Sequence, residues 1–181
     1  MKKMFLLLTA VLLLVATTAM ATQFEFSYTD SSNDIYGSGK LNAVDNGTGI
    51  FTVTAGNSTS IFLGADLGLF SLITNSNAPG VSTSPSGLFN YDDLLYYPPQ
   101  TALSNLDTSG LLFTNFNGIE LNIWGNGAGQ FYSAYTGLNG GYPAQYNNVT
   151  FSVTEVPEPS TMLLLAAGLS GLAAMRKRAK R

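Results

Sequence analysis

The sequence predicts an all-β fold: a single antiparallel β-sandwich or jelly-roll-like domain over residues 22–155, with an N-terminal signal helix before it and a C-terminal transmembrane helix after it. Two observations predict the β domain. Short stretches alternate apolar or aromatic residues with polar ones, the pattern of a strand with one buried face, and turns rich in Gly and Asn separate these stretches. The apolar residues do not keep the helical period of about 3.6 residues over three turns, so we expect little helix in this region. Many short strands separated by such turns are typical of a sandwich or jelly roll.

The alternation is clearest in residues 23–28, which have the sequence QFEFSY. The next two predicted strands, residues 39–44 and 50–54, flank the stretch DNGTG, in which Asn46-Gly47 supplies the positive φ angles of a hairpin turn. Residues 75–86 are rich in Asn, Pro, Gly and Ser and predict a long surface loop. Six further stretches have the pattern of a strand: residues 60–63, 69–74, 110–115, 119–124, 130–135 and 148–154.

Charge and composition exclude several classes of function. Residues 22–155 contain ten acidic residues and one basic residue, Lys40, which gives this region a net charge of −9. A domain with this charge repels phosphates and other anionic polymers, so we expect no nucleic acid partner. The charge favours cations and neutral, hydroxyl-rich partners instead. The chain has no Cys and no His, which excludes a disulfide framework, a thiol nucleophile and a histidine general base.

Residues 1–21 have the three parts of a secretory signal peptide. Two lysines supply the positive charge, residues 5–15 form an apolar run, and Ala19 and Ala21 frame an A-x-A cleavage site. The alternative is an uncleaved transmembrane helix, but such a helix needs about 20 apolar residues and this run is shorter. We therefore predict that signal peptidase cleaves after Ala21 and that the rest of the chain is exported.

A second apolar segment, residues 161–175, is followed at once by basic residues. As a helix it would span about 22 Å, which is thin for a bilayer core of about 30 Å, but flanking Arg and Lys side chains can reach the interface. An amphipathic core helix would show a polar face, which this segment lacks. A short basic tail behind an apolar helix is better explained as a stop-transfer signal than as a nucleic-acid-binding tail. We predict a transmembrane helix with its C-terminus in the cytoplasm. The stop-transfer residues are Arg176, Lys177, Arg178, Lys180 and Arg181.

Five residues join the β domain to the apolar segment: Val156, Pro157, Glu158, Pro159 and Ser160. Two prolines around a glutamate exclude helix and central strand, so this stretch is predicted to be extended and exposed, as a protease or transpeptidase requires. The Pro-Glu-Pro triplet, the apolar helix and the terminal basic cluster make residues 156–181 resemble the PEP-CTERM sorting signal of Gram-negative bacteria. More loosely, residues 35–54 and 91–124 are similar to exported proteins that carry this signal.

The resemblance implies how the protein is handled. Exosortase, a membrane enzyme, would cleave near the triplet and release or transfer the mature protein after a transient stay in the inner membrane. Such proteins accompany exopolysaccharide and biofilm loci. We therefore expect a structural or interaction role, not an enzymatic one, at the cell surface or in the extracellular polymer.

Aromatic residues crowd the second half of the β domain and raise an alternative, a polysaccharide-binding module. A face that presents Trp124, Tyr132 and Tyr135 would stack on sugar rings, while asparagines would supply hydrogen bonds. Aromatic residues at alternating positions are also what any β core uses. Exposure of these rings would favour the binding module, and burial would remove it.

A turn rich in oxygen donors is a candidate calcium site. Asp30, Asn33 and Asp34 lie close together in the sequence, and an exported acidic protein meets free Ca²⁺ outside the cell. The stretch does not match the D-x-D-x-D-G loop, and an Asx-turn between two strands explains the same residues more simply.

Paired carboxylates would be needed for a glycoside hydrolase, which is the remote alternative. Asp92 and Asp93 are adjacent, so in a strand they would point to opposite faces and could not pair with each other. A partner would have to come from Asp66 or Glu120, and nothing in the sequence demands that pairing.

Overall fold

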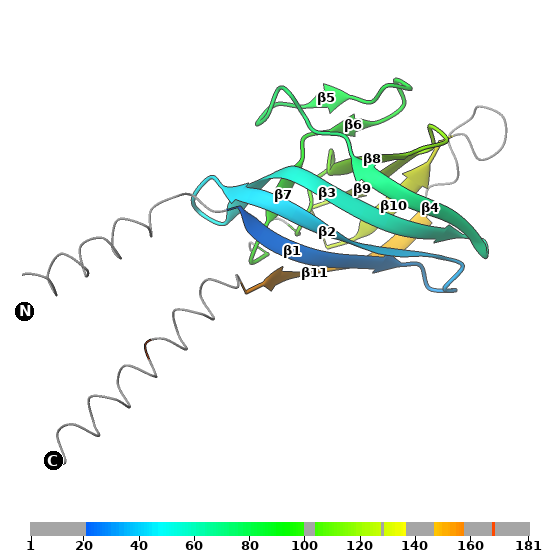
Figure 1. Ribbon diagram of the computed structural model, residues 1–181, viewed down its shortest axis with the longest axis horizontal. Coiled ribbons are helices and arrows are strands. Elements are labelled where there is room, and N and C mark those ends of the chain that lie inside the picture. Colours follow the sequence, from blue (N-terminus) through cyan, green and yellow to red (C-terminus); the bar gives the residue numbers. More distant parts are fainter. Residues whose placement is uncertain (1–20, 100–103, 128, 137–146, 158–167, 169–181) are drawn as a thin grey trace, which may run out of the picture.

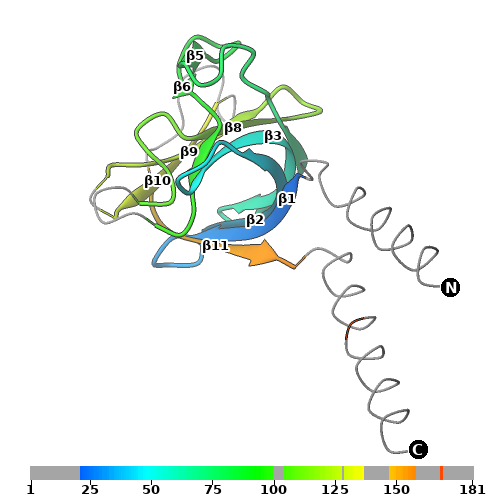
Figure 2. The same ribbon diagram turned by 90° about the vertical axis from the view of Figure 1, so that its left-hand side faces the viewer.

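The computed structural model describes residues 21–99, 104–127, 129–136, 147–157 and 168. Eight antiparallel strands form a sheet that closes on itself as a barrel (Figures 1 and 2). In order around the ring they are β1 (Thr22–Thr29), β2 (Ile35–Asp45), β3 (Ile50–Phe62), β4 (Ala65–Leu72), β8 (Leu111–Asn115), β9 (Glu120–Gly125), β10 (Phe131–Tyr135) and β11 (Asn147–Val156). The all-β prediction is confirmed. The sandwich or jelly roll is not, because β1 pairs with both β2 and β11 and so joins what would be two separate sheets into one ring.

The barrel strands overlap the predicted stretches, although β2 and β4 each begin four residues earlier than predicted. The clearest difference is at β3, which continues through residues 55–59 and takes in residues 60–62 of the short strand predicted at residues 60–63. Gly56 allows the close packing of β3 on β2, because a Cβ at this position would lie 2.7 Å from a methyl group of Leu41. The two strands therefore pair along their whole lengths, with one register shift after Asn42.

Inward-facing side chains of all eight strands fill the interior of the barrel. The Tyr135 hydroxyl lies 2.6 Å from Ser60 Oγ and 3.1 Å from the Tyr28 hydroxyl, so the polar groups inside are hydrogen-bonded to one another. Gly37 leaves room for Tyr28, because a Cβ at this position would lie 2.5 Å from the Tyr28 hydroxyl and 2.6 Å from the ring carbon that carries it. The fully buried large residues of this core include Phe24, Tyr28, Leu41, Phe70, Leu95, Leu106, Leu111, Phe113, Leu121, Ile123 and Tyr135.

Residues 73–91 form a cap on the outside of the barrel, over β8 and β9 (Figures 1 and 2). This segment includes the loop predicted at residues 75–86, and it is more ordered than a plain surface loop. Phe89 and Tyr91 of the cap pack against Leu112 of β8 in a second hydrophobic cluster. The remaining strands belong to the cap and to the segment that follows it: β5 (Ser82–Thr83), β6 (Asn90–Tyr91) and β7 (Leu94–Tyr96), of which β7 pairs with the start of β3.

The two ends of the barrel domain lie side by side. Gln23 at the start of β1 pairs with Val156 at the end of β11, so both ends of the domain are at the same end of the barrel (Figure 1). The predicted signal peptide, except for Ala21, and the predicted transmembrane segment, except for Gly168, lie outside the described residues. Within the part of the chain that the structure describes, no helix has the length and hydropathy of a membrane span.

Candidate functional site

The three aromatic residues predicted to bind sugars do not share one face. Trp124 and Tyr132 lie opposite each other on β9 and β10, and their half-buried rings stack on the outer side of the barrel, 5.6 Å apart with 23° between the ring planes. Tyr135 is fully buried in the interior, because alternate residues of a strand point to opposite sides and Tyr135 is three positions after Tyr132. The structure therefore leaves Trp124 and Tyr132 together and removes Tyr135 from the predicted sugar-binding face.

The candidate calcium residues all lie in the turn between β1 and β2. The Asp30 carboxylate accepts hydrogen bonds from the Asp34 N–H at 3.0 Å, the Ile35 N–H at 3.1 Å and the Ser32 hydroxyl at 2.6 Å. The bond from Ser32 is the main cause that lowers the pKa of Asp30. Asn33 has a φ of 60°, a left-handed conformation that Asn tolerates well. The carboxylate oxygens thus close an Asx-turn, and the described residues include no group of three Asp or Glu side chains that could hold a metal ion.

Two of the carboxylates considered for a hydrolase attach the cap to the barrel. Oδ2 of Asp93 accepts a hydrogen bond from the Asn75 N–H at 2.6 Å. The Glu120 carboxylate accepts bonds from Ser86, at 2.9 Å from the N–H and at 2.5 Å from the hydroxyl. Asn75 and Ser86 both belong to the cap. These carboxylates therefore act as acceptors for cap groups, and they do so from buried positions, where an unpaired N–H would be costly.

Asp92 and Asp93 are almost completely buried, with exposed fractions of 3% and 1%. The pKa of both carboxyl groups is raised to about 7; burial is the main cause at each, and a hydrogen bond with the Asp107 carboxyl contributes at Asp92. Asp93 has a φ of 59°, and its Oδ1 atom has no hydrogen-bond partner among the described residues. Asp66, by contrast, is exposed near the start of β4, where its carboxylate accepts the N–H of Gly68. Asp92, Asp93 and Glu120 are buried and Asp66 is exposed, so the four carboxylates occupy different surroundings.

A polar furrow runs across the outer side of β11, β1, β2 and β3. Its floor is one row of small hydroxyl residues in register, because Ser27 pairs with Ser152 and with Ser38, and Ser38 pairs with Thr59. Neighbouring strands lie about 4.8 Å apart, so this row is about 14 Å long. Rows of mostly larger residues form the two banks. The bank nearer the chain ends consists of Thr154, Glu25, Lys40 and Asn57. The opposite bank consists of Thr150, Thr29, Tyr36 and Ile61.

Two adjoining hollows make up the polar furrow. The hollow on the Tyr36 side has a volume of about 650 Å³, and the hollow on the Glu25 side has a volume of about 520 Å³. Ser27, Ser38 and Thr59 line both, so the hollows meet along the floor. The Thr59 hydroxyl donates to the Ser38 carbonyl at 3.3 Å. The floor serines make no side-chain hydrogen bond to any other described residue, which leaves their hydroxyls available to a ligand.

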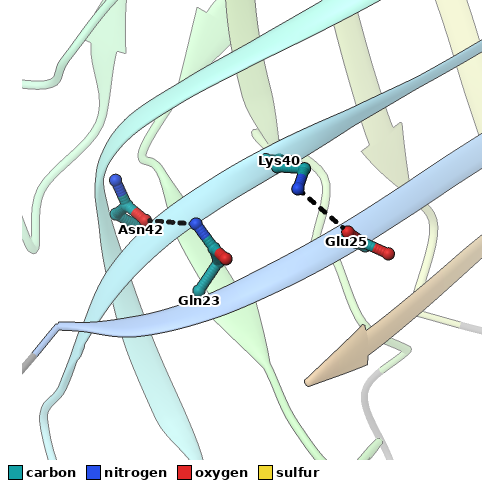
Figure 3. A network of polar contacts seen from close by, with 4 residues as sticks. All are labelled: Gln23, Glu25, Lys40 and Asn42. Atoms are coloured by element: carbon teal, nitrogen blue, oxygen red, sulfur yellow. Dashed lines mark hydrogen bonds and ion pairs between the residues drawn. The ribbon is translucent and has the colours of Figure 1, made fainter. Parts of the chain in front are cut away.

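The charges beside the furrow neutralise each other. Lys40 Nζ lies 3.1 Å from Glu25 Oε1, and both side chains are about half exposed (Figure 3). Beyond this pair, toward the chain ends, Gln23 Nε2 donates to Asn42 Oδ1 at 3.5 Å (Figure 3). Lys40 is also the sole basic residue in residues 22–155. The furrow therefore offers neutral donors and acceptors and little net charge.

The sequence pattern does not by itself indicate this furrow, although it contains part of the signal. Ser27 and Ser152 occupy the polar positions of two predicted strands, residues 23–28 and 148–154, and their exposure follows from the alternation. Ser38 lies just before the strand predicted at residues 39–44. The row can be recognised only from the register of β11 on β1, and the local pattern does not specify that register.

Only the first two residues of the predicted processing motif are described. Val156 is half-buried at the end of β11, and Pro157 is exposed immediately after it. Ala21, at the predicted signal-peptidase cut, is exposed immediately before β1. The remaining residues of both processing sites and of the basic cluster lie outside the described residues: Ala19, Glu158, Pro159, Ser160, Arg176, Lys177, Arg178, Lys180 and Arg181.

Comparison with known proteins supports the assignment of the C-terminal segment. Residues 155–178 match the family model described as the PEP-CTERM protein-sorting motif. No curated protein and no solved structure matches the chain. The match confirms the resemblance drawn from the Pro-Glu-Pro triplet, the apolar segment and the basic cluster, and it implies exosortase as the processing partner. The chain therefore carries a PEP-CTERM sorting motif over residues 155–178, the signal of exported proteins that are sorted at the membrane.

Proposed function

We propose that this chain is an exported interaction protein that exosortase delivers to the cell surface or the extracellular polymer. One observation carries the proposal: both processing sites adjoin the same end of the barrel, where Gln23 pairs with Val156 (Figure 1). A membrane at this end would hold the signal peptide and the sorting segment together. The walls of the barrel and its opposite end would remain accessible to partners outside the cell.

The order of processing follows from this arrangement. Signal peptidase cuts after Ala21, and residues 161–175 hold the chain in the inner membrane with the basic cluster in the cytoplasm. Exosortase then cuts near the Pro-Glu-Pro triplet. Pro157 directly follows β11, so a cut at or after the triplet leaves the whole ladder between β11 and β1 in place. The barrel is released, or transferred to the surface, as a closed unit.

The proposed role is binding without catalysis. Its support is that Asp93 and Glu120, two of the carboxylates available for hydrolysis, are buried and accept hydrogen bonds from the cap. Such carboxylates serve the fold, and moving them would expose unpaired donors. A structural or interaction role in exopolysaccharide or biofilm matches the family association of the sorting motif and remains part of the proposal.

A second candidate is a polysaccharide-binding module that uses the outer aromatic pair. The observation that favours it is the stacking of Trp124 on Tyr132 on the outer side of the barrel, where aromatic rings can contact sugars. Trp124 also packs against the second hydrophobic cluster beneath the cap, so part of this pair is structural.

Mass spectrometry of the mature protein tests the export proposal. In a host that contains exosortase, the secreted protein should lack residues 1–21 and the basic cluster. A chain with Pro157→Ala, Glu158→Ala and Pro159→Ala should stay in the membrane fraction with its basic cluster intact, whereas an Asn148→Ala control, at an exposed position of β11 outside the motif, should be processed normally. An intact C-terminus on the wild-type protein in that host would contradict exosortase sorting, although not secretion.

A further inference from the structure

We propose that the polar furrow binds a chain of neutral polysaccharide, with Tyr36 as the ring on which a sugar stacks. The inference rests on the proposed function, because the polymer has to meet the barrel outside the cell. The site is distinct from the aromatic residues that the sequence suggested, since it lies on β11, β1, β2 and β3 and they lie on β9 and β10.

The shape of the furrow suits an extended polymer. Its floor crosses four strands and is about 14 Å long, which exceeds a single sugar ring. The two hollows have volumes of about 650 and about 520 Å³ and share Ser27, Ser38 and Thr59 in their linings. The floor is low because Ser27, Ser38 and Ser152 are small, and the banks are higher because Tyr36 and Lys40 are large. A chain lying along the floor would therefore contact both banks.

The chemistry of the lining matches a hydroxyl-rich ligand. Serine hydroxyls are both donors and acceptors, so a row of them can bond to sugar hydroxyls in either direction. Asn57 on one bank adds an amide, which offers donors and an acceptor as well. Tyr36 is 45% exposed and supplies an apolar ring face beside these polar groups, the combination that an amphipathic sugar ring requires.

The negative charge of the domain favours a neutral polymer over an anionic one as the ligand. Residues 22–155 carry a net charge of −9, and the lysine beside the furrow is paired with Glu25 at 3.1 Å. An anionic polysaccharide would meet repulsion and would have to compete with Glu25 for Lys40. A second copy of the barrel would bring the same negative charge. A peptide that adds a strand would need an open sheet edge, and the closed ring offers none among the eight barrel strands.

Affinity electrophoresis of the full-length chain tests the proposal independently of export. The chain is purified in a zwitterionic detergent without a sugar headgroup and run in native gels with and without dextran, galactomannan or hydroxyethyl cellulose. Alginate serves as the anionic probe. We expect at least one neutral polymer to retard the wild-type chain. Tyr36→Ala should weaken this binding by about tenfold, and Ser38→Gln, which fills the floor, should weaken it at least as much.

Matched variants separate the furrow from a general surface effect. Phe116→Ala removes a fully exposed ring on the β8–β9 turn, and Ser76→Gln makes the same serine exchange in the cap, so neither should change binding. Lys40→Gln removes the cation beside the furrow and shows whether any retardation by alginate depends on it, once its altered mobility in polymer-free gels is subtracted. Thermal unfolding of each variant shows whether the barrel is intact.

Three results would overturn the inference. They are no retardation by any neutral polymer, loss of binding in Tyr132→Ala but not in Tyr36→Ala, and retardation by alginate that Lys40→Gln abolishes. None of them bears on export, which the mass of the mature protein decides separately. A correctly processed protein without furrow binding would thus leave the proposed function in place and remove this inference.

Discussion

Two walls of the same barrel differ in what covers their outer sides. The bare wall, formed by β11, β1, β2 and β3, alternates buried and exposed residues along β1 and β11 and presents polar side chains outward. The capped wall, formed by β8, β9 and β10, is buried on both sides, so almost every residue of β8 and β9 is inaccessible. Its outward residues include Leu112 and Ala134, which pack beneath the cap.

The difference shows how one sheet combines a covered wall with an open one. The outward apolar residues of the capped wall need a cover, and residues 73–91 supply it with a second hydrophobic cluster. The outward hydroxyls and amides of the bare wall need only water, so this wall stays open. A ligand therefore has access to the bare wall without displacing any part of the fold.

The largest expected effect is from a cavity in the capped wall. Leu112 is fully buried under the cap, and Leu112→Ala should lower the free energy of unfolding by about 2–5 kcal/mol. Ser152→Ala, an outward residue of the bare wall, should change it by no more than about 0.5 kcal/mol. Urea unfolding of both variants measures the contrast. Similar values for the two would mean that the cap adds nothing to stability.

A smaller effect is expected from removal of one cap anchor. Glu120→Ala leaves the Ser86 N–H and hydroxyl without their acceptor and should cost about 1–3 kcal/mol. Glu25→Ala on the bare wall removes a half-exposed ion pair and should cost at most about 0.5 kcal/mol. Hydrogen exchange measures where the loss occurs. In Glu120→Ala, faster exchange should be confined to residues 84–89, and a uniform increase through the barrel strands would contradict the anchoring role.

The third prediction concerns the pH dependence of stability at the base of the cap. The pKa of Asp92 and Asp93 is about 7 in the folded protein, so the folded state keeps protons that the unfolded state releases from about pH 4 upward. The free energy of unfolding should therefore fall as the pH rises toward and through 7, by at most about 1.4 kcal/mol per pH unit for each carboxyl group, and should then level off.

Asp93→Asn tests this pH dependence. Asn tolerates the φ of 59° at this position, and the variant should show a shallower slope and greater stability than the wild type near pH 8. Urea unfolding at several values from about pH 5 to about pH 8 provides the measurement. Glu25→Gln is the control on the bare wall. An unchanged slope in Asp93→Asn would mean that this carboxyl does not titrate in the window.

The strands were more predictable than the sites. The strands predicted at residues 23–28 and 148–154 correspond to β1 and β11 and show the expected alternation. Burial of one face of a strand produces this alternation between neighbouring residues, so the sequence reveals it. The prediction that Tyr135 belongs to a sugar-binding face is wrong, because Tyr135 lies on the same side of β10 as Phe131, inside the barrel. The cap looked like a plain loop in the sequence, because its anchors Asp93 and Glu120 lie outside it in the chain.

The sequence by itself determined the strand segments, the acidic character of residues 22–155 and the sorting motif at residues 155–178, since each depends on residues close together in the chain. The tertiary structure alone decided that the sheet closes as a barrel, that one wall is capped and that Ser152, Ser27, Ser38 and Thr59 form one row. The closed ring and the row depend on the pairing of β1 with β11, which come from opposite ends of the domain, and the cap depends on its contacts with Leu112 and Glu120. Local alternation is the same in a sandwich and in a barrel, so only long-range pairing distinguishes them.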